Sequence, residues 1–304
     1  MLKIIFLGTA GSFPTPKRNP SCIFVNREGE LLLFDCGEGA QRQMMVAKCG
    51  IMHISSIFIT HFHADHVLGI PGLIQTLSFN GREEPLTIYG PVGVERFVRL
   101  FTSLGHFRLG FDVVPVEVSG GDAIMRDGYR IVVFNTVHGV PSVGYALIED
   151  ERPGRFNRER AISLGVPPGP LFRKLHQGES VEIEGRIVTS EDVVGAPRRG
   201  RKIVYTGDTR PIDEIVKASL GADVLIHDAS MADDLNDWAR ETKHSTAGEA
   251  ARTAVDASVK QLILTHISAR YSDNTDTLLN DAKQVFKNTV VAHDLMELAV
   301  PYPK

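Results

Sequence analysis

Short apolar runs of β-favouring residues recur along the whole chain, and segments with helical spacing lie between them. Examples are residues 3–8 (KIIFLG), 55–60 (SSIFIT) and 202–208 (KIVYTGD), each of which ends in turn-forming or polar residues. Such an alternation of strands and helices is typical of α/β proteins. Runs 22–26 and 31–35 follow each other with no helix between them. The sequence therefore predicts an α/β fold with mixed sheets rather than purely parallel ones.

Composition and charge narrow the class of protein. The chain has 304 residues, 43% hydrophobic and 23% charged, as in ordinary globular proteins. A net charge of -4 excludes a basic field over the whole surface, although not a local basic patch. The three cysteines, Cys22, Cys36 and Cys49, form no CxxC pair, which favours a reducing compartment. No apolar run approaches the roughly 18 residues needed to span a bilayer. We expect a cytoplasmic protein with no membrane partner.

One segment, residues 150–176, interrupts the alternation with several prolines and a cluster of arginines. Its centre, residues 164–172 (LGVPPGPLF), predicts neither a regular helix nor an interior strand, because proline lacks the amide donor that both need. We interpret residues 150–196 as a flexible arm inserted into a single domain that spans residues 1–304. The composition alone fits an elaborated surface loop equally well.

Four metal-binding side chains lie within six positions directly after the apolar run 55–60. They are His61, His63, Asp65 and His66, in the sequence HFHADH. Imidazole nitrogen and carboxylate oxygen are ligands that Zn²⁺ and similar metals accept. Four such groups from one loop exceed the needs of a single ion, so two neighbouring ions explain them better. The density of the cluster and its place after a buried strand disfavour a chance group on a surface turn.

Three more polar residues end apolar runs elsewhere in the chain. His138 follows residues 130–137, Asp208 follows residues 202–207, and His266 follows residues 261–265. Each alone would be interpreted as a turn or capping residue. Because loops at strand ends carry function on a rigid scaffold, their shared placement predicts that they complete the metal site.

These motifs resemble the five-motif pattern of the metallo-β-lactamase superfamily. The stretches that carry the resemblance are THFHADH, TVHG, YTGD and LTHISARY. The stretches HDAS (227–230), KHSTAGEAA (243–251) and PPGPLF extend it to the ribonuclease Z family, over nearly the whole chain. The resemblance implies an αββα sandwich of two mixed β-sheets flanked by helices. It also implies a homodimeric, zinc-dependent endoribonuclease that removes the 3′ trailer from precursor tRNA and leaves a 3′-hydroxyl on the tRNA.

The resemblance also implies a ligand set for two zinc ions per subunit. One ion would be held by His61, His63 and His138, the second by Asp65, His66 and His266, with Asp208 bridging them. Two such ions activate a water molecule for in-line attack on a phosphodiester. Manganese and iron accept similar ligands, so the identity of the metal stays open.

Three residues receive catalytic roles from the same resemblance. Asp65 would orient the attacking water, and His244 would protonate the leaving oxygen. Asp228 would orient His244, although it is one methylene shorter than the glutamate usual at this position. Without the resemblance, His244 would be interpreted as a residue close to a helix N-terminus.

RNA binding by an acidic chain requires local basic patches. The stretch PTPKRN (14–19) resembles a family loop near the cleavage site, but its lysine lies one place later than usual, so discrimination against a CCA end stays open. The stretch PRRGRK (197–202) is also basic. Ser268 and Arg270 would contact a phosphate or brace the site, or Arg270 would pair with an acid. The predicted RNA-contacting residues are Lys17, Arg18, Asn19, Ser268, Arg270, Arg155, Arg158, Arg173 and Lys174.

Two other functions fit parts of the sequence. A small-molecule phosphodiesterase or thioester hydrolase of the same fold would need neither the arm nor the KHST stretch. A non-catalytic RNA-binding protein with a structural zinc would not need seven ligands. Residues 69–79 (GIPGLIQTLSF) predict an apolar helix, and periodicity does not separate a dimer interface from a core-facing helix.

Overall fold

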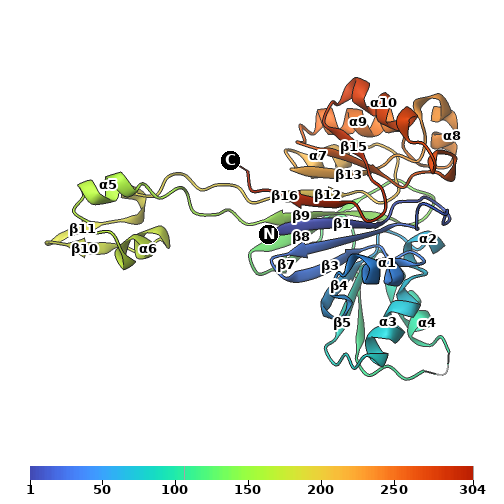
Figure 1. Ribbon diagram of the computed structural model, residues 1–304, viewed down its shortest axis with the longest axis horizontal. Coiled ribbons are helices and arrows are strands. Elements are labelled where there is room, and N and C mark those ends of the chain that lie inside the picture. The colour runs from blue at the N-terminus through green and yellow to red at the C-terminus, as the bar shows by residue number, and fades with distance from the viewer. Residues whose placement is uncertain (106, 304) are drawn as a thin grey trace. The chain divides into compact units, whose positions relative to one another are not determined.

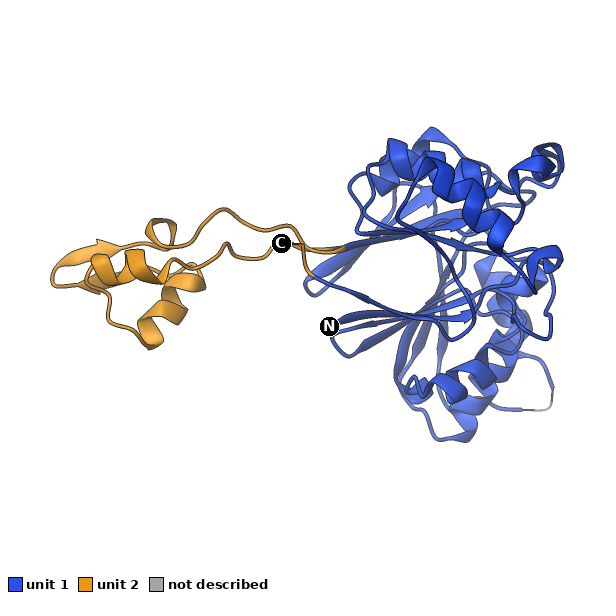
Figure 2. Ribbon diagram, turned by 45° about the horizontal axis from the view of Figure 1, so that its top comes forward, with its two compact units in different colours: residues 1–148, 202–301 blue, residues 149–201, 302–304 orange. Residues whose placement is uncertain are grey.

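The computed structural model describes residues 1–105 and 107–303. It divides into two compact units (Figure 2). The first contains residues 1–148 and 202–301, and the second contains residues 149–201 together with the C-terminal end from Tyr302.

Within the described residues, the first unit contains two seven-stranded sheets. The first sheet has the order β16 (Glu297–Val300), β1 (Leu2–Gly8), β2 (Cys22–Arg27), β3 (Glu30–Phe34), β4 (Ile54–Phe58), β5 (Leu86–Gly90) and β6 (Val113–Glu117). The second has the order β15 (Thr289–Val291), β14 (Leu262–Thr265), β13 (Val224–Asp228), β12 (Lys202–Tyr205), β9 (Val143–Glu149), β8 (Tyr129–Asn135) and β7 (Ala123–Arg126).

Both sheets are mixed, as the sequence predicted. In the first, β1 pairs with β2 antiparallel, whereas β3, β4, β5 and β6 run parallel. In the second, β12 to β15 run parallel and β12 pairs with β9 antiparallel. The carboxyl ends of β12, β13 and β14 therefore lie at one edge of the sheet, where Asp208, Asp228 and His266 follow.

Helices cover the outer face of each sheet (Figure 1). Those of the first sheet are α1 (Ala40–Ala47), α2 (Ala64–Val67), α3 (Ile70–Phe79) and α4 (Val94–Thr102). Those of the second are α7 (Asp213–Ser219), α9 (Ala247–Asp256) and α10 (Asp276–Val285), while α8 (Asn236–Glu241) packs against the 3₁₀ helix at Asp233–Leu235. Short 3₁₀ helices are η1 (Ile51–His53), η2 (Ser190–Asp192), η3 (Asp233–Leu235) and η4 (Ala269–Tyr271).

Three hydrophobic clusters fill the spaces between these layers. One lies between the first sheet and its helices and includes Leu33 and Leu73. The second fills the space between the sheets and includes Phe58 and Tyr145. The third packs the second sheet against its helices through small side chains such as Ala250 of α9. The predicted αββα sandwich of two mixed sheets is confirmed.

The second unit has its own secondary structure and its own core. Its elements are α5 (Arg158–Ser163), α6 (Pro170–His176), β10 (Val181–Ile183) and β11 (Arg186–Val188). Its hydrophobic cluster includes Ala161, Leu175 and Val181. The expectation that residues 164–172 contain no helix was wrong at their end, since α6 begins at Pro170. Proline fits the first position of a helix because the amide there has no intrahelical partner.

No helix among residues 1–105 and 107–303 has both the length and the apolar character needed to cross a membrane.

Candidate metal centre

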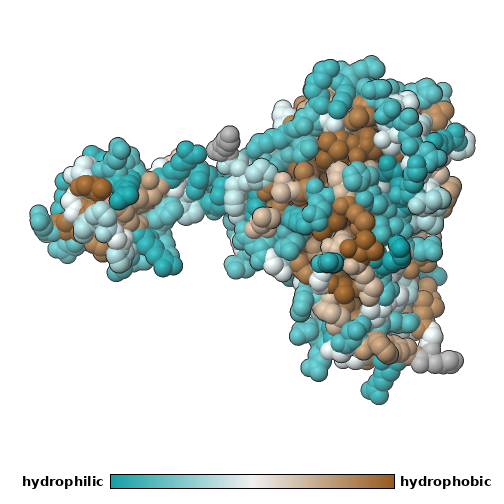
Figure 3. Space-filling view, viewed as in Figure 1, coloured by the Kyte–Doolittle hydropathy of each residue, from teal (hydrophilic) through white to brown (hydrophobic). Residues whose placement is uncertain are grey.

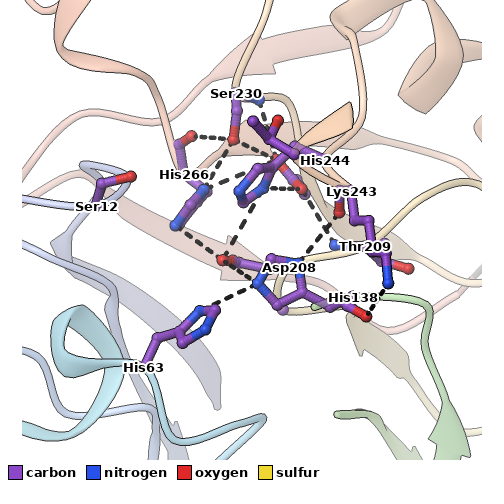
Figure 4. A network of polar contacts seen from close by, with 12 residues as sticks. Ser12, His63, His138, Asp208, Thr209, Ser230, Lys243, His244 and His266 are labelled. Carbon is purple, nitrogen blue, oxygen red and sulfur yellow. Dashed lines mark hydrogen bonds and ion pairs between the residues drawn. The ribbon is translucent and has the colours of Figure 1, made fainter. Parts of the chain in front are cut away.

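The polar residues that follow β4, β8, β12 and β14 meet at one edge of the sandwich (Figure 4). Three groups of described side chains have ligand atoms that lie within 4.8 Å of one another inside each group, and the third, Asp208, Asp228, His244 and His266, shares members with the other two. The first contains His61, His63, His138 and Asp208, and the second contains Asp65, His66 and His266. The structure thus brings together all seven residues that the sequence predicted as metal ligands.

The first group is centred on the ring of His63. Its Nδ1 atom lies 3.1 Å from Nε2 of His61 and 3.1 Å from Nε2 of His138. The Oδ2 atom of Asp208 lies 3.6 Å from Nε2 of His61 and 3.8 Å from Nε2 of His138. Three imidazoles and one carboxylate oxygen therefore face a common point.

The second group is centred on Asp65. Its Oδ2 atom lies 3.3 Å from Nε2 of His266 and 3.5 Å from Nε2 of His66. Asp208 reaches this group too, because its Oδ2 atom lies 3.1 Å from Nε2 of His266 and its Oδ1 atom 3.4 Å from Nε2 of His66. The carboxylate of Asp208 thus lies between the two groups.

The protonation preferences of these side chains suit metal ligands. Burial lowers the pKa of His61, His63 and His138, which keeps these imidazoles neutral. Burial opposes the charged form of Asp208, but His266, His66 and His61 outweigh it and hold its pKa well below the ordinary value. Metal ions bind neutral imidazole and ionised carboxylate, so His61, His63, His138 and Asp208 are in the required form. His66 differs, because Asp208 and Asp35 outweigh burial and raise its pKa, so this imidazole must release a proton when a metal ion binds.

Two buried polar atoms at the centre have no hydrogen-bond partner among the described residues. They are Nε2 of His66 and Oδ1 of Asp208. Buried polar atoms without a partner are rare because their desolvation is costly. Together with the concentration of nitrogen and oxygen donors, these two atoms show that the residues present fit divalent metal ions.

Asp35, which the sequence analysis did not single out, holds the ring of His66. Its Oδ2 atom accepts hydrogen bonds from Nδ1 of His66 at 2.7 Å and from the hydroxyl of Tyr205 at 2.8 Å. Asp35 is fully buried and also binds the backbone and hydroxyl of Thr60. A carboxylate in this position orients the histidine so that Nε2 faces the centre. Asp35 follows the apolar run 31–34, the same signal that identified Asp208.

Next to the second group, His244 and Asp228 form a hydrogen-bonded pair. Nδ1 of His244 lies 2.9 Å from Oδ2 of Asp228, which is fully buried. Although burial opposes the charge, Asp228 raises the pKa of His244 to about 9. The ring of His244 stacks on that of His266 with centroids 5.0 Å apart. The short aspartate side chain therefore reaches the histidine that the sequence assigned to it.

The three residues of the loop 14–19 that were predicted to contact RNA, Lys17, Arg18 and Asn19, have different surroundings. Lys17 is exposed and its Nζ atom lies 2.8 Å from Oδ1 of Asp273. Arg18 is buried, and its Nη1 atom donates to the hydroxyl of Thr9 at 2.7 Å and to the carbonyl of Ala292 at 2.6 Å. Arg18 thus braces the loop from inside, which differs from the RNA contact that the sequence suggested. Asn19 donates to Oδ2 of Asp294 through its backbone and side chain.

Of the remaining residues predicted to contact RNA, Ser268 is half-buried and the others are exposed. Arg270 is exposed in η4, which begins directly after the N-terminal cap Ser268, and the Cζ atom of Arg270 lies 5.8 Å from the ring centroid of Trp238. Arg201, in the basic stretch 197–202, is buried and paired with Glu149, Nε to Oε2 at 2.6 Å. It therefore does not add to an exposed basic patch. In the second unit, all four residues predicted to contact RNA are exposed, namely Arg155, Arg158, Arg173 and Lys174.

Two helix-covered mixed sheets with histidines and aspartates at their strand ends define a hydrolase of the metallo-β-lactamase fold that binds divalent metal. Residues 176–267 match the family model described as beta-lactamase superfamily domain, and residues 2–100 match that of the anti-Pycsar protein Apyc1. The chain is 58% identical to ribonuclease Z of Methanosarcina acetivorans and 60% identical to ribonuclease Z of Methanosarcina mazei, over 99% of each chain. It belongs to the ribonuclease Z family and is an enzyme.

A solved structure agrees with this assignment. The crystal structure of human tRNase Z, short form, is similar to this chain with a TM-score of 0.72 and 29% sequence identity. The similarity covers 98% of this chain and 99% of the human one.

Proposed function

We propose that this enzyme removes the 3′ trailer from precursor tRNA by hydrolysing one phosphodiester bond with the aid of two divalent metal ions, of which zinc suits the ligands best. The observation that carries the proposal is the position of Asp208. Its two carboxylate oxygens lie 3.1–3.8 Å from imidazole nitrogens of both ligand groups. The ribonuclease Z relatives and the similarity to human tRNase Z support precursor tRNA as the substrate.

The ligand groups assign residues to two ions. His61, His63 and His138 would hold one ion, Asp65, His66 and His266 the other, and Asp208 would contact both. When bound, such a pair of ions polarises the scissile phosphate and supplies an activated water at neutral pH. Manganese or iron would bind the same donors with lower affinity than zinc.

Side chains of the protein would orient the attacking water and protonate the leaving oxygen. Oδ2 of Asp65 accepts a hydrogen bond from the backbone of Ser12 at 2.8 Å, which fixes this carboxylate for orienting the attacking water. His244 donates through Nδ1 to Asp228, so that Nε2 carries the proton available to the leaving ribose oxygen. A pKa of about 9 keeps His244 charged at neutral pH. Cleavage then leaves a 3′-hydroxyl on the tRNA.

Substrate binding is assigned to local basic groups, because the net charge of the chain is -4. In the second unit we assign contacts with the tRNA to Arg155, Arg158, Arg173 and Lys174, in an arm inserted into a single-domain fold. Near the metal centre we assign them to Lys17, Asn19, Ser268 and Arg270, and we give Arg18 the bracing role. We further propose that the enzyme acts as a homodimer.

The test is to incubate the purified protein with a precursor tRNA, with and without a chelator, and to map both product ends. We expect one cut at the trailer boundary, a 3′-hydroxyl on the tRNA, loss of activity with the chelator and recovery with added zinc. Cleavage that persists at full rate in the chelator would reject the metal-dependent reaction. Turnover of small phosphodiesters with no cleavage of precursor tRNA would reject the substrate.

A further inference from the structure

We propose that Arg210 is a positioning residue that holds His244 at a set distance from Asp208. This inference rests on the proposed role of His244 as proton donor. Arg210 is two positions after Asp208 in the chain, and its guanidinium reaches the backbone of His244 (Nη1 to the carbonyl oxygen, 2.5 Å). The same side chain therefore connects the segment that carries Asp208 with the segment that carries the proton donor.

The guanidinium is itself fixed by Glu249 of α9. Nη1 of Arg210 lies 2.8 Å from Oε2 of Glu249, and Nη2 donates to Oε1. The side chains of Arg210 and Glu249 are only 16% and 9% exposed, so solvent screens this pair weakly. Glu249 also accepts a hydrogen bond from the backbone of Thr246 at 3.0 Å, in the capping box that starts α9. This bidentate pair thus fixes Arg210 to α9, which begins at Ala247, three positions after His244.

The backbone of Arg210 reaches the other ligand group. Its amide donates to the carbonyl of Val137 at 2.9 Å, and Val137 precedes His138. The amide of Val137 donates in turn to the hydroxyl of Thr209 at 3.1 Å. Three chain segments that carry His138, Asp208 and His244 are therefore connected through one residue.

The segment around His244 needs such support. It lies between α8 and α9, and Lys243 has a φ of 59°, a left-handed conformation that is unfavourable for a residue with a side chain. The amide of His244 is held by the carbonyl of Ala239 at 2.8 Å and its ring by Asp228. The bond from Arg210 to its carbonyl is the third attachment. Proton transfer depends steeply on geometry, so loosening this attachment should slow the step that His244 assists.

The test compares two substrates that differ in their need for a proton donor. The leaving oxygen of RNA is a poor leaving group, whereas p-nitrophenolate leaves without protonation. In Arg210→Met and Glu249→Gln we expect kcat for precursor tRNA to fall about 10- to 100-fold with KM nearly unchanged, which is less than the roughly 100- to 10,000-fold that a general acid contributes, because His244 itself is retained. Hydrolysis of bis(p-nitrophenyl) phosphate should change by less than about threefold, and Arg210→Lys should recover part of the loss on RNA. Arg252→Met, at an exposed position of α9, is the matched control.

Two measurements separate positioning from a general loss of structure. Hydrogen exchange of residues 242–246, in protein prepared without metal, should rise in Arg210→Met and not in Arg252→Met, and both variants should bind the same amount of zinc. The double variant Arg210→Met, His244→Ala should be no slower on RNA than His244→Ala alone, because both changes affect one step. Three outcomes would overturn the inference. The double variant could be slower than His244→Ala by the full factor of Arg210→Met, hydrogen exchange in Arg210→Met could equal that of the wild type, or Arg210→Met could slow both substrates equally.

The variant His244→Ala shows which proposal has failed. If it slows both substrates equally, the assignment of His244 as proton donor is wrong. If it slows only the RNA reaction while Arg210→Met slows both or neither, the proton donor stands and the inference about Arg210 is wrong.

Discussion

Nδ1 of His244 lies 2.9 Å from Oδ2 of Asp228, a fully buried carboxylate at the end of β13. Asp228 also accepts hydrogen bonds from the hydroxyl of Ser230 at 2.7 Å and from the amide of Thr209 at 3.1 Å. A carboxylate held this firmly keeps its charge, and the histidine it contacts is stabilised as imidazolium. With His244 as the proposed proton donor, this pair predicts that activity is lost at high pH.

The first prediction concerns the alkaline side of the pH profile. As the proposed proton donor, His244 must be protonated to act, and its pKa is raised to about 9, because the attraction to Asp228 outweighs burial. The kcat for precursor tRNA should therefore hold below pH 9 and fall about tenfold per pH unit above it. Asp228→Asn removes the attraction while burial remains, so the fall should begin at lower pH. An identical profile in wild type and Asp228→Asn would contradict the assignment.

The second prediction concerns Asp208 and metal content. Asp208→Asn removes the carboxylate charge that lies close to His61, His66, His138 and His266. We expect the zinc bound per chain, measured by elemental analysis after dialysis, to fall well below that of the wild type, together with activity. Asp234→Asn, at an exposed position, is the control and should retain both. Full metal content in Asp208→Asn would show that Asp208 does not join the two ligand groups.

The third prediction concerns Asp35, which orients His66 without facing the centre. Asp35→Asn keeps the shape but removes the charge and one of the two acceptor oxygens, so the side chain can no longer accept from both the amide of Thr60 and Nδ1 of His66. Loss of such a partner typically weakens metal affinity by about 10- to 100-fold. Competition with a zinc indicator would measure the affinity directly. An affinity equal to wild type would show that the ring of His66 is held by its packing alone.

The meeting of the proposed ligand residues could be predicted because they follow apolar runs, and parallel strands bring their carboxyl ends to one edge of a sheet. Asp208 was identified in this way, and Asp35 carried the same signal. A polar residue after an apolar run indicates the end of a strand. It does not indicate whether that residue faces the candidate metal centre, as Asp208 does, or orients another side chain from behind, as Asp35 does. That distinction depends on how two sheets pack against each other, which no local pattern contains.

The sequence did not predict which charged side chains are buried. Arg18 and Arg201 occur in basic stretches that look exposed, yet both are buried with partners distant in sequence. The bond from Arg210 to Glu249 likewise spans 39 positions. Charge and spacing identify a basic stretch, but only the tertiary fold decides which of its members reach solvent.

The fourth prediction concerns the second unit, which has its own hydrophobic cluster. Gly154 lies against Gly195 and Ala196, and Arg152 pairs with Arg198 through backbone hydrogen bonds of 2.8 and 2.9 Å. Replacing residues 155–195 by a two-residue turn should therefore leave the first unit folded. We expect binding of precursor tRNA to weaken by about tenfold or more, since phosphate contacts are lost, with little change for bis(p-nitrophenyl) phosphate. Equal effects on both substrates would refute a role of this unit in tRNA binding.

A subtler variant separates charge from the presence of the unit. Arg173→Gln with Lys174→Gln keeps α6 and its buried Leu175 but removes two exposed charges. Binding should weaken, and its dependence on salt concentration should become less steep, because fewer counterions are released from the RNA. An unchanged salt dependence would place the phosphate contacts elsewhere.

The fifth prediction concerns the proposed homodimer. On the face that Figure 3 shows, hydrophobic residues gather in the part of the first unit that includes α1. Met45 of α1 and Leu68, just before α3, are 57% and 53% exposed and line one surface groove with Gly72. Exposed apolar groups that adjoin in this way are typical of interfaces between proteins. For the proposed homodimer, we expect this groove to lie in the interface with the second copy of the chain.

The variant Met45→Glu, Leu68→Glu would place four charges at the interface of a symmetric dimer, where burial of like charges is unfavourable. Analytical ultracentrifugation should show a dimer for the wild type and a monomer for this variant. Met125→Glu, at an exposed position of β7, is the control and should remain dimeric. If one subunit binds tRNA for the centre of the other, the monomer should lose cleavage of precursor tRNA but keep hydrolysis of the small phosphodiester. A double variant that still sediments as a dimer would place the interface on another face.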